Sequence, residues 1–235
     1  MNLKQEAALH ALSYVQDGML LGLGTGSTTA YFIDLLGEKL RAGELHGITG
    51  VPTSEETIRR ALKAGIPLTS LTASLQGADL PSLDLAVDGA DEIDAKLNLI
   101  KGLGRALLRE KVIEMHARRF VVIADESKVV DRLGRGPLPV EILPFEYQVQ
   151  VRWLNTLGCR AELWREADGS HMVTDNDNYL ARCWFEAGIP DPYALARTLA
   201  DRPGILEHGL FLDMGSLAVV AGSNGVKVME RETCS

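Results

Sequence analysis

The first 132 residues alternate between two patterns of hydrophobic positions. Short continuous apolar runs, typical of buried strands, occupy residues 19–24, 83–87 and 119–125. Apolar residues at helical spacing occupy residues 3–16, 27–43 and 104–117, and residues 48–65 combine a short strand, a Thr/Ser cap and a helix ending at Gly65. Strands that alternate with helices predict an α/β fold, with a Rossmann-like, mostly parallel sheet and helices on both faces.

The alternation stops at residues 133–144, where three prolines and two glycines indicate a hinge or crossing. Short strand-like runs follow, so residues from 145 to about 207 predict a small α+β subdomain. Residues 209–230 carry two apolar runs around Gly-Ser-Asn-Gly, a hairpin signal, and are expected to return to the main sheet. We therefore predict a main α/β domain of residues 1–132 and 208–235, and a smaller α+β subdomain of residues 133–207.

Composition and charge narrow the class of protein. With 46% apolar and 24% charged residues, the chain of 235 residues is typical of a globular protein. Its apolar runs are shorter than the roughly 20 residues of a membrane helix, so no membrane segment is predicted. A net charge of -8 argues against nucleic acid as a partner, since phosphates require a basic surface. An anionic ligand would need a few local cations.

Cysteine usage and the N-terminal residues bear on the compartment. Cys159, Cys183 and Cys234 are odd in number, widely spaced and outside any CxxC pattern, which favours free thiols over a zinc site or a disulfide framework. The N-terminal residues lack a basic segment followed by an apolar one, so a secretory signal is not expected. These features predict a cytoplasmic protein.

A glycine-rich segment at residues 22–32, GLGTGSTTAYF, lies between a predicted strand and a predicted helix. Such a helix N-terminus can bind an anion through its N–H groups and its dipole. The spacing matches neither the dinucleotide fingerprint nor the ATP-type loop. A turn needed only for packing and a cradle for a single phosphate are equally supported. In the second case Ser27 and Thr28 would supply hydroxyls, and Lys4 and Lys128 are candidate cations.

Four carboxylates lie close together at Asp88, Asp91, Glu92 and Asp94. Aspartate clusters are natural ligands of Mg²⁺ or Ca²⁺, but this spacing does not match a calcium loop and no second cluster completes a shell, so no metal is predicted. Asp88 and Asp91 follow the carboxyl end of a predicted strand, where open α/β sheets bind ligands. A solvated turn fits Glu92 and Asp94 better than it fits the other two.

A second glycine-rich segment, KGLGRALLREK, begins at Lys101. Glu110 falls about two turns into the predicted helix, on the same stripe as Ala106 and Ile113. A carboxylate that borders an apolar face loses solvation, and lost solvation raises a carboxyl pKa toward values useful for a general base. Most helical glutamates are simply exposed, so the pattern alone leaves both interpretations of Glu110 open.

These segments, together with IADESKVVDRLG, LPVEILPF, VTDNDN and PGILEHGLF, occur in the order found in type A ribose-5-phosphate isomerases, and the resemblance covers essentially the whole chain. It implies interconversion of D-ribose 5-phosphate and D-ribulose 5-phosphate through an enediolate, in the pentose phosphate pathway. It also implies that the main domain is catalytic, that no metal or organic cofactor is needed, and that the chain forms a homodimer or homotetramer.

The resemblance also implies roles for individual residues. Glu110 would move the proton between C2 and C1, Asp88 and Asp91 would hold substrate hydroxyls and assist ring opening, and Lys101 would stabilise the enediolate oxygen with the backbone of Gly102, Leu103 and Gly104. The remaining substrate-binding residues would be Thr25, Gly26, Ser27, Thr28, Gly89, Ala90, Lys128 and Lys4.

Several positions depart from the family's pattern, among them Cys183, where LARC replaces a run that normally ends in aspartate. Leu103 stands where the family usually has another glycine, and its N–H can serve only if its φ stays negative. Arg105 adds bulk and charge beside the expected oxyanion donors. Asp177 replaces a glycine in the smaller subdomain.

Two other functions remain to be distinguished. A non-catalytic sugar-phosphate sensor would bind the ligand without turnover. The sequence contains no recognisable helix-turn-helix or basic DNA-reading segment, which counts against this function. An enzyme similar to the CoA-transferases would use Glu110 as a nucleophile and would bind CoA.

Overall fold

The computed structural model describes residues 2–74 and 82–231, and the chain divides into two compact units. Unit 1 comprises Met1–Ala90, Arg109–Lys128 and Met214–Ser235, and unit 2 comprises Asp91–Leu108 and Val129–Asp213. The domain limits expected from the sequence, at residues 132 and 208, stay a prediction. Cys234 lies outside the described residues.

Unit 1 is built on a sheet with the strand order β13-β12-β6-β3-β1-β2. Its strands are β1 (Leu20–Leu23), β2 (Thr49–Pro52), β3 (Leu85–Gly89), β6 (Phe120–Asp125), β12 (Leu217–Gly222) and β13 (Gly225–Glu230). All neighbouring strands run parallel except β13, which forms a hairpin with β12. The mostly parallel sheet, and the return of the last two strands to it, are therefore confirmed.

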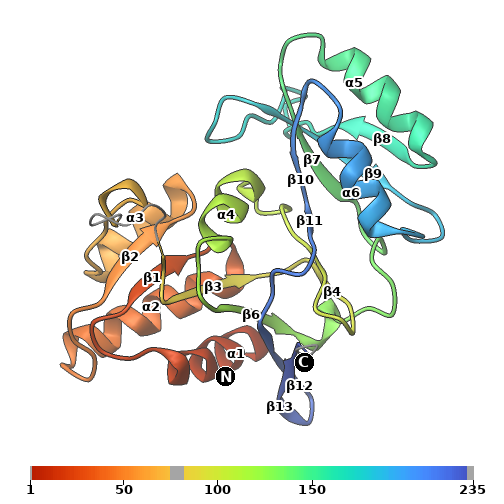
Figure 1. Ribbon diagram of the computed structural model, residues 1–235. Helices are drawn as coiled ribbons and strands as arrows, with labels where there is room; N and C mark the ends of the chain where they lie inside the picture. Colours follow the sequence, from red (N-terminus) through yellow and green to blue (C-terminus); the bar gives the residue numbers. More distant parts are fainter. Residues whose placement is uncertain (1, 75–81, 232–235) are drawn as a thin grey trace. The chain divides into compact units, whose positions relative to one another are not determined.

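Helices pack against both faces of this sheet. They are α1 (Leu3–Ala11), α2 (Ser27–Arg41), α3 (Glu55–Ala64) and α4 (Leu107–Glu114). Figure 1 shows α1 and α2 on one side, where α1 contacts β6 and β12 and α2 contacts β3. On the other side, Ile113 of α4 packs in a cluster with Val51 and Leu83. The carboxyl ends of β1, β3 and β6 thereby meet the loops that carry most of the predicted site residues.

Unit 2 holds two antiparallel sheets. The larger has the order β10-β7-β9-β8 and the smaller β11-β5-β4. Their strands are β7 (Leu138–Ile142), β8 (Arg160–Leu163), β9 (Tyr179–Trp184), β10 (Ile205–His208), β4 (Glu92–Ile93), β5 (Leu99–Ile100) and β11 (Leu210–Phe211). Helices α5 (Tyr147–Leu154) and α6 (Pro192–Ala200) accompany the larger sheet, and Leu154 and Leu199 belong to one buried cluster with Val140 and Ile142. A smaller α+β part is confirmed.

Several local elements differ from the expectations. The stretch 133–144 contains the inner strand β7, which its prolines concealed because proline is uncommon inside a sheet. The first helix ends at Ala11 and continues as a 3-10 turn, η1 (Leu12–Tyr14). Helix α2 begins after Gly26, a residue with a φ of 117° and no side chain to cap the helix. The expected cap of α3 is confirmed, since the Ser54 hydroxyl accepts from the Thr57 N–H.

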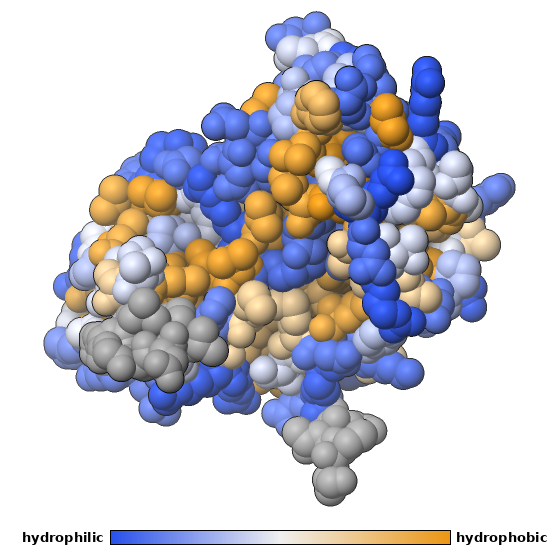
Figure 2. Space-filling model, turned by 45° about the horizontal axis from the view of Figure 1, so that its top comes forward, coloured by the Kyte–Doolittle hydropathy of each residue, from blue (hydrophilic) through white to orange (hydrophobic). Residues whose placement is uncertain are grey.

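Apolar residues also reach the surface. Figure 2 shows hydrophobic residues among hydrophilic ones on the face that it draws. Among the large hydrophobic side chains of residues 2–74 and 82–231, the most exposed is that of Phe145, just before α5, at 80%. Among residues 2–74 and 82–231, every helix is too short or too polar to cross a membrane.

Candidate active site

Asp88, near the end of β3, is hydrogen-bonded to the glycine-rich loop of unit 1. Its side chain is fully buried, and its Oδ1 accepts from the N–H of Thr25 at 3.0 Å, the hydroxyl of Thr29 at 2.9 Å and the N–H of Gly89 at 2.6 Å. A Cβ at Gly24 would lie 2.0 Å from the Asp88 carboxyl carbon. Glycine at position 24 is thus a condition for the close approach of this carboxylate to the loop.

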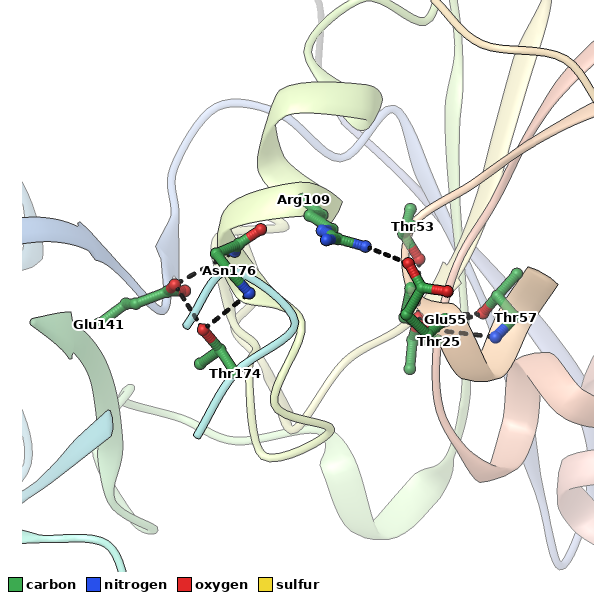
Figure 3. Close-up of polar contacts among 9 residues, drawn as sticks. Thr25, Thr53, Glu55, Thr57, Arg109, Glu141, Thr174 and Asn176 are labelled. Carbon is green, nitrogen blue, oxygen red and sulfur yellow. Dashed lines mark hydrogen bonds and ion pairs between the residues drawn. The ribbon is translucent and has the colours of Figure 1, made fainter. Parts of the chain in front are cut away.

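The Thr25 side chain is held by a buried cluster of hydroxyls. Its Oγ1 lies 2.7 Å from that of Thr53, 2.8 Å from Oγ of Ser54 and 3.1 Å from Oγ1 of Thr57. Figure 3 labels the three threonines. Thr57 also donates to the Gly24 carbonyl at 2.7 Å. The Thr25 hydroxyl therefore fixes the loop against the start of α3, and its N–H is already given to Asp88.

The N-terminus of α2 lies beside a lysine from another helix. Ser27 is the first helical residue and is exposed, and the Lys4 ammonium of α1 donates to its Oγ at 2.8 Å. The first N–H groups of a helix have no partner within the helix, and they carry the positive end of its dipole. Together with Thr28 in the same turn, this arrangement suits a phosphate.

Asp125 is a residue of this region that the sequence reasoning missed. Burial opposes its ionisation, but hydrogen bonds from the hydroxyl and N–H of Ser127 and the charges of Lys128 and Lys4 lower its pKa below the ordinary value. The two predicted phosphate-binding lysines thus act on one carboxylate. Asp125 is the last residue of β6, and Asp88 is the last but one of β3. Both aspartates follow an apolar run, and this shared position is the sequence signal that could have identified Asp125.

Glu110 lies in the first turn of α4, not two turns into it as expected. The helix begins at Leu107, later than expected, because Gly102 and Arg105 have φ values of 109° and 70°, which are not helical. Glu110 is only 2% exposed, and Ala106 and Ile113 are buried as well, so the predicted buried stripe is confirmed. A carboxylate in the first turn is stabilised by the helix dipole.

The neighbouring Arg109 ties this turn to the start of α3. Its guanidinium lies 3.1 Å from the Glu55 carboxylate, an ion pair that Figure 3 draws. Glu55 is the first residue of α3, whose cap contributes to the hydroxyl cluster around Thr25. Within unit 1, the turn that carries Glu110 and the loop that holds Asp88 are both connected to the beginning of α3.

Asp91 and the second glycine-rich loop belong to unit 2. The Leu103 N–H donates to Asp91 Oδ2 at 2.9 Å, and Leu103 lies outside the positive-φ region. Lys101 is 2% exposed, with its ammonium 5.4 Å from the centre of the Phe211 ring. Asp91 therefore holds the loop backbone, and Lys101 is buried. Gly104 is exposed and Ala90, at the edge of unit 1, is half-buried.

Arg105 extends away from its strained backbone into a side-chain cluster of unit 2. Its guanidinium binds both carboxylate oxygens of Glu166, at 2.5 and 3.1 Å, and lies 5.2 Å from the centre of the Trp164 ring. A fork that binds two oxygens fixes orientation better than a single contact. The bulky residue that departs from the family pattern is thus accommodated by partners in its own unit.

The two other acids of the cluster behave differently from each other. Asp94 accepts from the N–H groups of Lys96 and Asn98 at 2.8 Å each, so its expected role in finishing the turn is confirmed. The solvated-turn interpretation is wrong for Glu92, which is 3% exposed and accepts from the N–H groups of Gly134 and Gly136. Glu92 is needed because those loop N–H groups would otherwise lack an acceptor.

A second buried carboxylate network, in unit 2, was not foreseen. Glu141 of β7 is fully buried, and its Oε1 accepts from the Thr174 hydroxyl at 2.9 Å and from the amides of Asn176 at 3.2 Å and Asn178 at 2.9 Å. Figure 3 shows Glu141 with Thr174 and Asn176. Across the described part of the chain, no group of three His, Cys, Asp or Glu side chains is placed to share a metal ion.

Comparison with known proteins gives a consistent picture. The family model for ribose 5-phosphate isomerase A (phosphoriboisomerase A) matches residues 49–225. Ribose-5-phosphate isomerase A of Roseiflexus sp. (strain RS-1) is 50% identical over 95% of this chain and 93% of the relative. A probable ribose-5-phosphate isomerase 2 of Arabidopsis thaliana is 45% identical over 97% of this chain and 86% of the relative.

Solved structures agree with these relatives. A D-ribose-5-phosphate isomerase in complex with phospho-erythronic acid has a TM-score of 0.92 at 42% identity, over 98% of this chain and all of the other. Ribose 5-phosphate isomerase from Plasmodium falciparum also has a TM-score of 0.92, at 36% identity, over 98% of this chain and 99% of the other. The resemblance found in the motifs is confirmed, and the chain belongs to the ribose 5-phosphate isomerase A family.

Proposed function

We propose that this protein interconverts D-ribose 5-phosphate and D-ribulose 5-phosphate through an enediolate, a step of the pentose phosphate pathway. By its family it is an isomerase, and a related enzyme has been solved with phospho-erythronic acid. The observation that carries the mechanism is the burial of Glu110, at 2% exposure, in the first turn of a helix. Aldose–ketose exchange needs a base beside a carbon acid, and it needs no redox centre.

Glu110 is the base in this mechanism. Its carboxylate takes the proton from C2 of the open-chain aldose as the negative charge passes to the C1 carbonyl oxygen. The proton of the C2 hydroxyl then moves to that oxygen, and Glu110 returns its own proton to C1, so C2 becomes the carbonyl carbon of the ketose. Burial supports this role because a base excluded from water is not solvated by competing hydrogen bonds. The ion pair of Arg109 with Glu55 supports a fixed position for the turn.

The developing oxyanion is stabilised by Lys101 and by N–H groups of residues 102–104. Asp91 contributes by holding the loop through the Leu103 N–H, in addition to its proposed role in holding a substrate hydroxyl. Asp88 handles the other hydroxyls and assists ring opening. Three donors on its Oδ1 support a carboxylate held in one orientation, and Gly89 and Ala90 continue the same turn.

The phosphate is bound at the start of α2. Gly26, Ser27 and Thr28 offer N–H groups and hydroxyls, and Lys4 and Lys128 supply positive charge. The contact of Lys4 with Ser27, and the action of both lysines on Asp125, support this grouping. Thr25 supports the loop from beneath through its hydroxyl cluster.

The test compares two neighbouring glutamates of α4 in a coupled assay with ribose 5-phosphate. Glu110→Gln should lower kcat by about 1,000-fold, within the range for removal of a general base. Glu114→Gln is the matched control, because Glu114 is 3% exposed one turn further along the same helix, and it should keep near-parental activity. Full activity in Glu110→Gln would refute the role of the base.

The parent protein separates the alternatives. Turnover of ribose 5-phosphate that persists after treatment with a chelator supports an isomerase that needs no metal ion. Thermal stabilisation by ribose 5-phosphate without turnover would instead indicate a sugar-phosphate sensor. A glutamyl thioester trapped at Glu110 with CoA would indicate the transferase chemistry.

We also propose that the chain works in the cytoplasm as a homodimer or homotetramer, with residues 1–132 and 208–235 as its catalytic domain and 133–207 as its smaller subdomain. Exposed apolar side chains of the subdomain, such as Phe145 at 80% and Val149 at 48%, support an interface between copies. Sedimentation velocity measures the assembly directly, and a monomer at micromolar concentration would contradict it.

A further inference from the structure

Two cysteines lie on the same face of the larger sheet in unit 2. In the antiparallel pairing of β8 with β9, Ala161 faces Cys183 and Arg160 faces Trp184. Cys159 comes immediately before β8 and two residues before Ala161, so the alternation of the strand, continued by one residue, places it diagonally across from Cys183 on the same side of the sheet. Cys183 is a buried member of the apolar cluster of unit 2 and Cys159 packs against that cluster, which supports the shared face.

The two sulfurs have different environments. Cys183 is 1% exposed, whereas Cys159 is half-buried and therefore within reach of a small solute. The Cys159 thiol donates to the Leu154 carbonyl at 3.2 Å, which fixes the direction of its side chain at the end of α5. Both cysteines are free thiols in the reduced protein.

The neighbouring sulfurs also change each other's acidity. A hydrogen bond from the Cys183 thiol lowers the pKa of Cys159 below that of an ordinary thiol, although partial burial opposes this. The same hydrogen bond, together with burial, raises the pKa of Cys183 well above its usual value. The thiolate is the nucleophile, so Cys159, with the lower pKa, is the more reactive cysteine. Cys183 is suited to be the resolving cysteine.

We propose that Cys159 and Cys183 form a redox-active pair, in which a hydroperoxide oxidises Cys159 and Cys183 then closes an intramolecular disulfide between the start of β8 and β9. The site is separate from the residues proposed for isomerisation. It makes the smaller part of the chain a place where peroxide leaves a reversible covalent mark.

The chemistry balances with hydrogen peroxide as the oxidant. The Cys159 thiolate attacks one peroxide oxygen, the O–O bond breaks and hydroxide leaves, which gives a sulfenic acid. The Cys183 sulfur attacks the sulfenic sulfur, the S–S bond forms, the S–O bond breaks, and water leaves with the thiol proton. In sum, two thiols and one peroxide give one disulfide and two waters, and an external dithiol reverses the bond.

The geometry also predicts how stable the bond is toward reduction. Diagonal neighbours across an antiparallel pair are about 7–8 Å apart, farther than directly opposed residues. Closing the bond therefore requires a small movement of the chain at Cys159, just before β8 begins, and leaves some strain. A strained disulfide is easily reduced, so the pair should respond reversibly instead of serving as a permanent crosslink.

The test uses the full chain with Cys234→Ser, which leaves only these two cysteines. The protein is treated with hydrogen peroxide, quenched, alkylated under denaturing conditions and digested for mass spectrometry. A linked peptide pair containing Cys159 and Cys183, lost again with dithiothreitol, is the expected result. Alkylation of both thiols, a sulfinic acid at Cys159 beside an alkylated Cys183, or a disulfide joining two chains would each overturn the proposal.

Two matched variants in the same background test the order of events. With Cys183→Ser, a sulfenic acid should accumulate at Cys159 and be trapped by dimedone. With Cys159→Ser, Cys183 should stay reduced at the same dose, and its equal oxidation would overturn the assigned order. Cys183→Ala, which removes the hydrogen-bond donor, should slow alkylation of Cys159 several-fold at neutral pH, and unchanged isomerase activity reports that each variant is folded.

Discussion

Asp88 in unit 1 and Glu141 in unit 2 are two fully buried carboxylates that use the same hydrogen-bonding pattern. In each, a single oxygen accepts three hydrogen bonds. The donors differ, since two of those on Asp88 are backbone N–H groups, whereas all three on Glu141 are side chains. Charge-assisted hydrogen bonds of this kind are stronger than neutral ones.

The difference shows what each carboxylate can be used for. Backbone donors hold Asp88 against the glycine-rich loop, where the missing Cβ at Gly24 lets the carboxylate approach. Side-chain donors from residues 174–178 enclose Glu141, and its Oε2 is buried with no hydrogen-bond partner among the described residues. We propose that the same pattern serves chemistry in unit 1 and fixes a loop in unit 2, and the following variants test that contrast.

The largest expected effect is on activity, at Asp88. Asp88→Asn keeps the shape of the side chain but removes its charge, so we expect kcat/KM to fall by about 100-fold or more, as for other acid–base groups. Asp84→Asn is the matched control, because Asp84 accepts the Leu20 N–H at 2.9 Å at the opposite end of β3. Equal losses in the two variants would mean that Asp88 has only a structural role.

The next effect is on stability, at Glu141. Glu141→Ala leaves two buried donors, Thr174 and Asn178, and the half-buried Asn176 without their acceptor, and should lower the free energy of unfolding by about 3 kcal/mol. Urea denaturation measures this, and the folded fraction should keep its kcat. Glu186→Ala, at an exposed position of the same unit, should change stability by less than about 0.5 kcal/mol. A large loss of kcat in folded Glu141→Ala would remove the contrast with Asp88.

The sequence revealed one of these two regions and concealed the other. Asp88 is next to Gly89 and follows an apolar run, so neighbouring residues carry the signal. Glu141 meets Thr174 only after β7 and β9 have paired, and no local pattern encodes that meeting. For the same reason the parallel sheet and the final hairpin could be predicted from periodicity. The strand in residues 133–144 and the hydrogen bonds that Glu92 accepts from Gly134 and Gly136 could not.

A smaller effect concerns the loop that brings its donors to Glu141. Asp177 has a φ of 60°, in the region that favours glycine, and its side chain is exposed. Asp177→Gly should therefore raise the free energy of unfolding by about 0.5 kcal/mol, while Asp177→Ala should lower it. Chemical denaturation of the pair checks this. Destabilisation by glycine would show that the Asp177 side chain makes a favourable local contribution.

The smallest effect involves Asp125, a third carboxylate, which unlike the other two is partly exposed. Its pKa is lowered from the ordinary 3.8, so its stabilising effect is present above pH 3.8 and is lost as pH falls through the lower folded pKa. Ser127→Ala removes one donor and should cost about 0.3 kcal/mol at pH 7, by analogy with exposed pairs. Denaturation at acidic pH should show a smaller difference, and a difference that grows with acidity would contradict this assignment.

The order of the strands has a consequence for the chain as it leaves the ribosome. β6 pairs with β12, yet the segment Val129–Asp213 is translated between them. Until β12 emerges, β6 is an open edge, and unpaired edges are prone to pair with other chains. The segment between them, with its own buried cluster, can fold during that interval, since domains generally fold as they are made. Synthesis therefore completes the insert first and the isomerase sheet last.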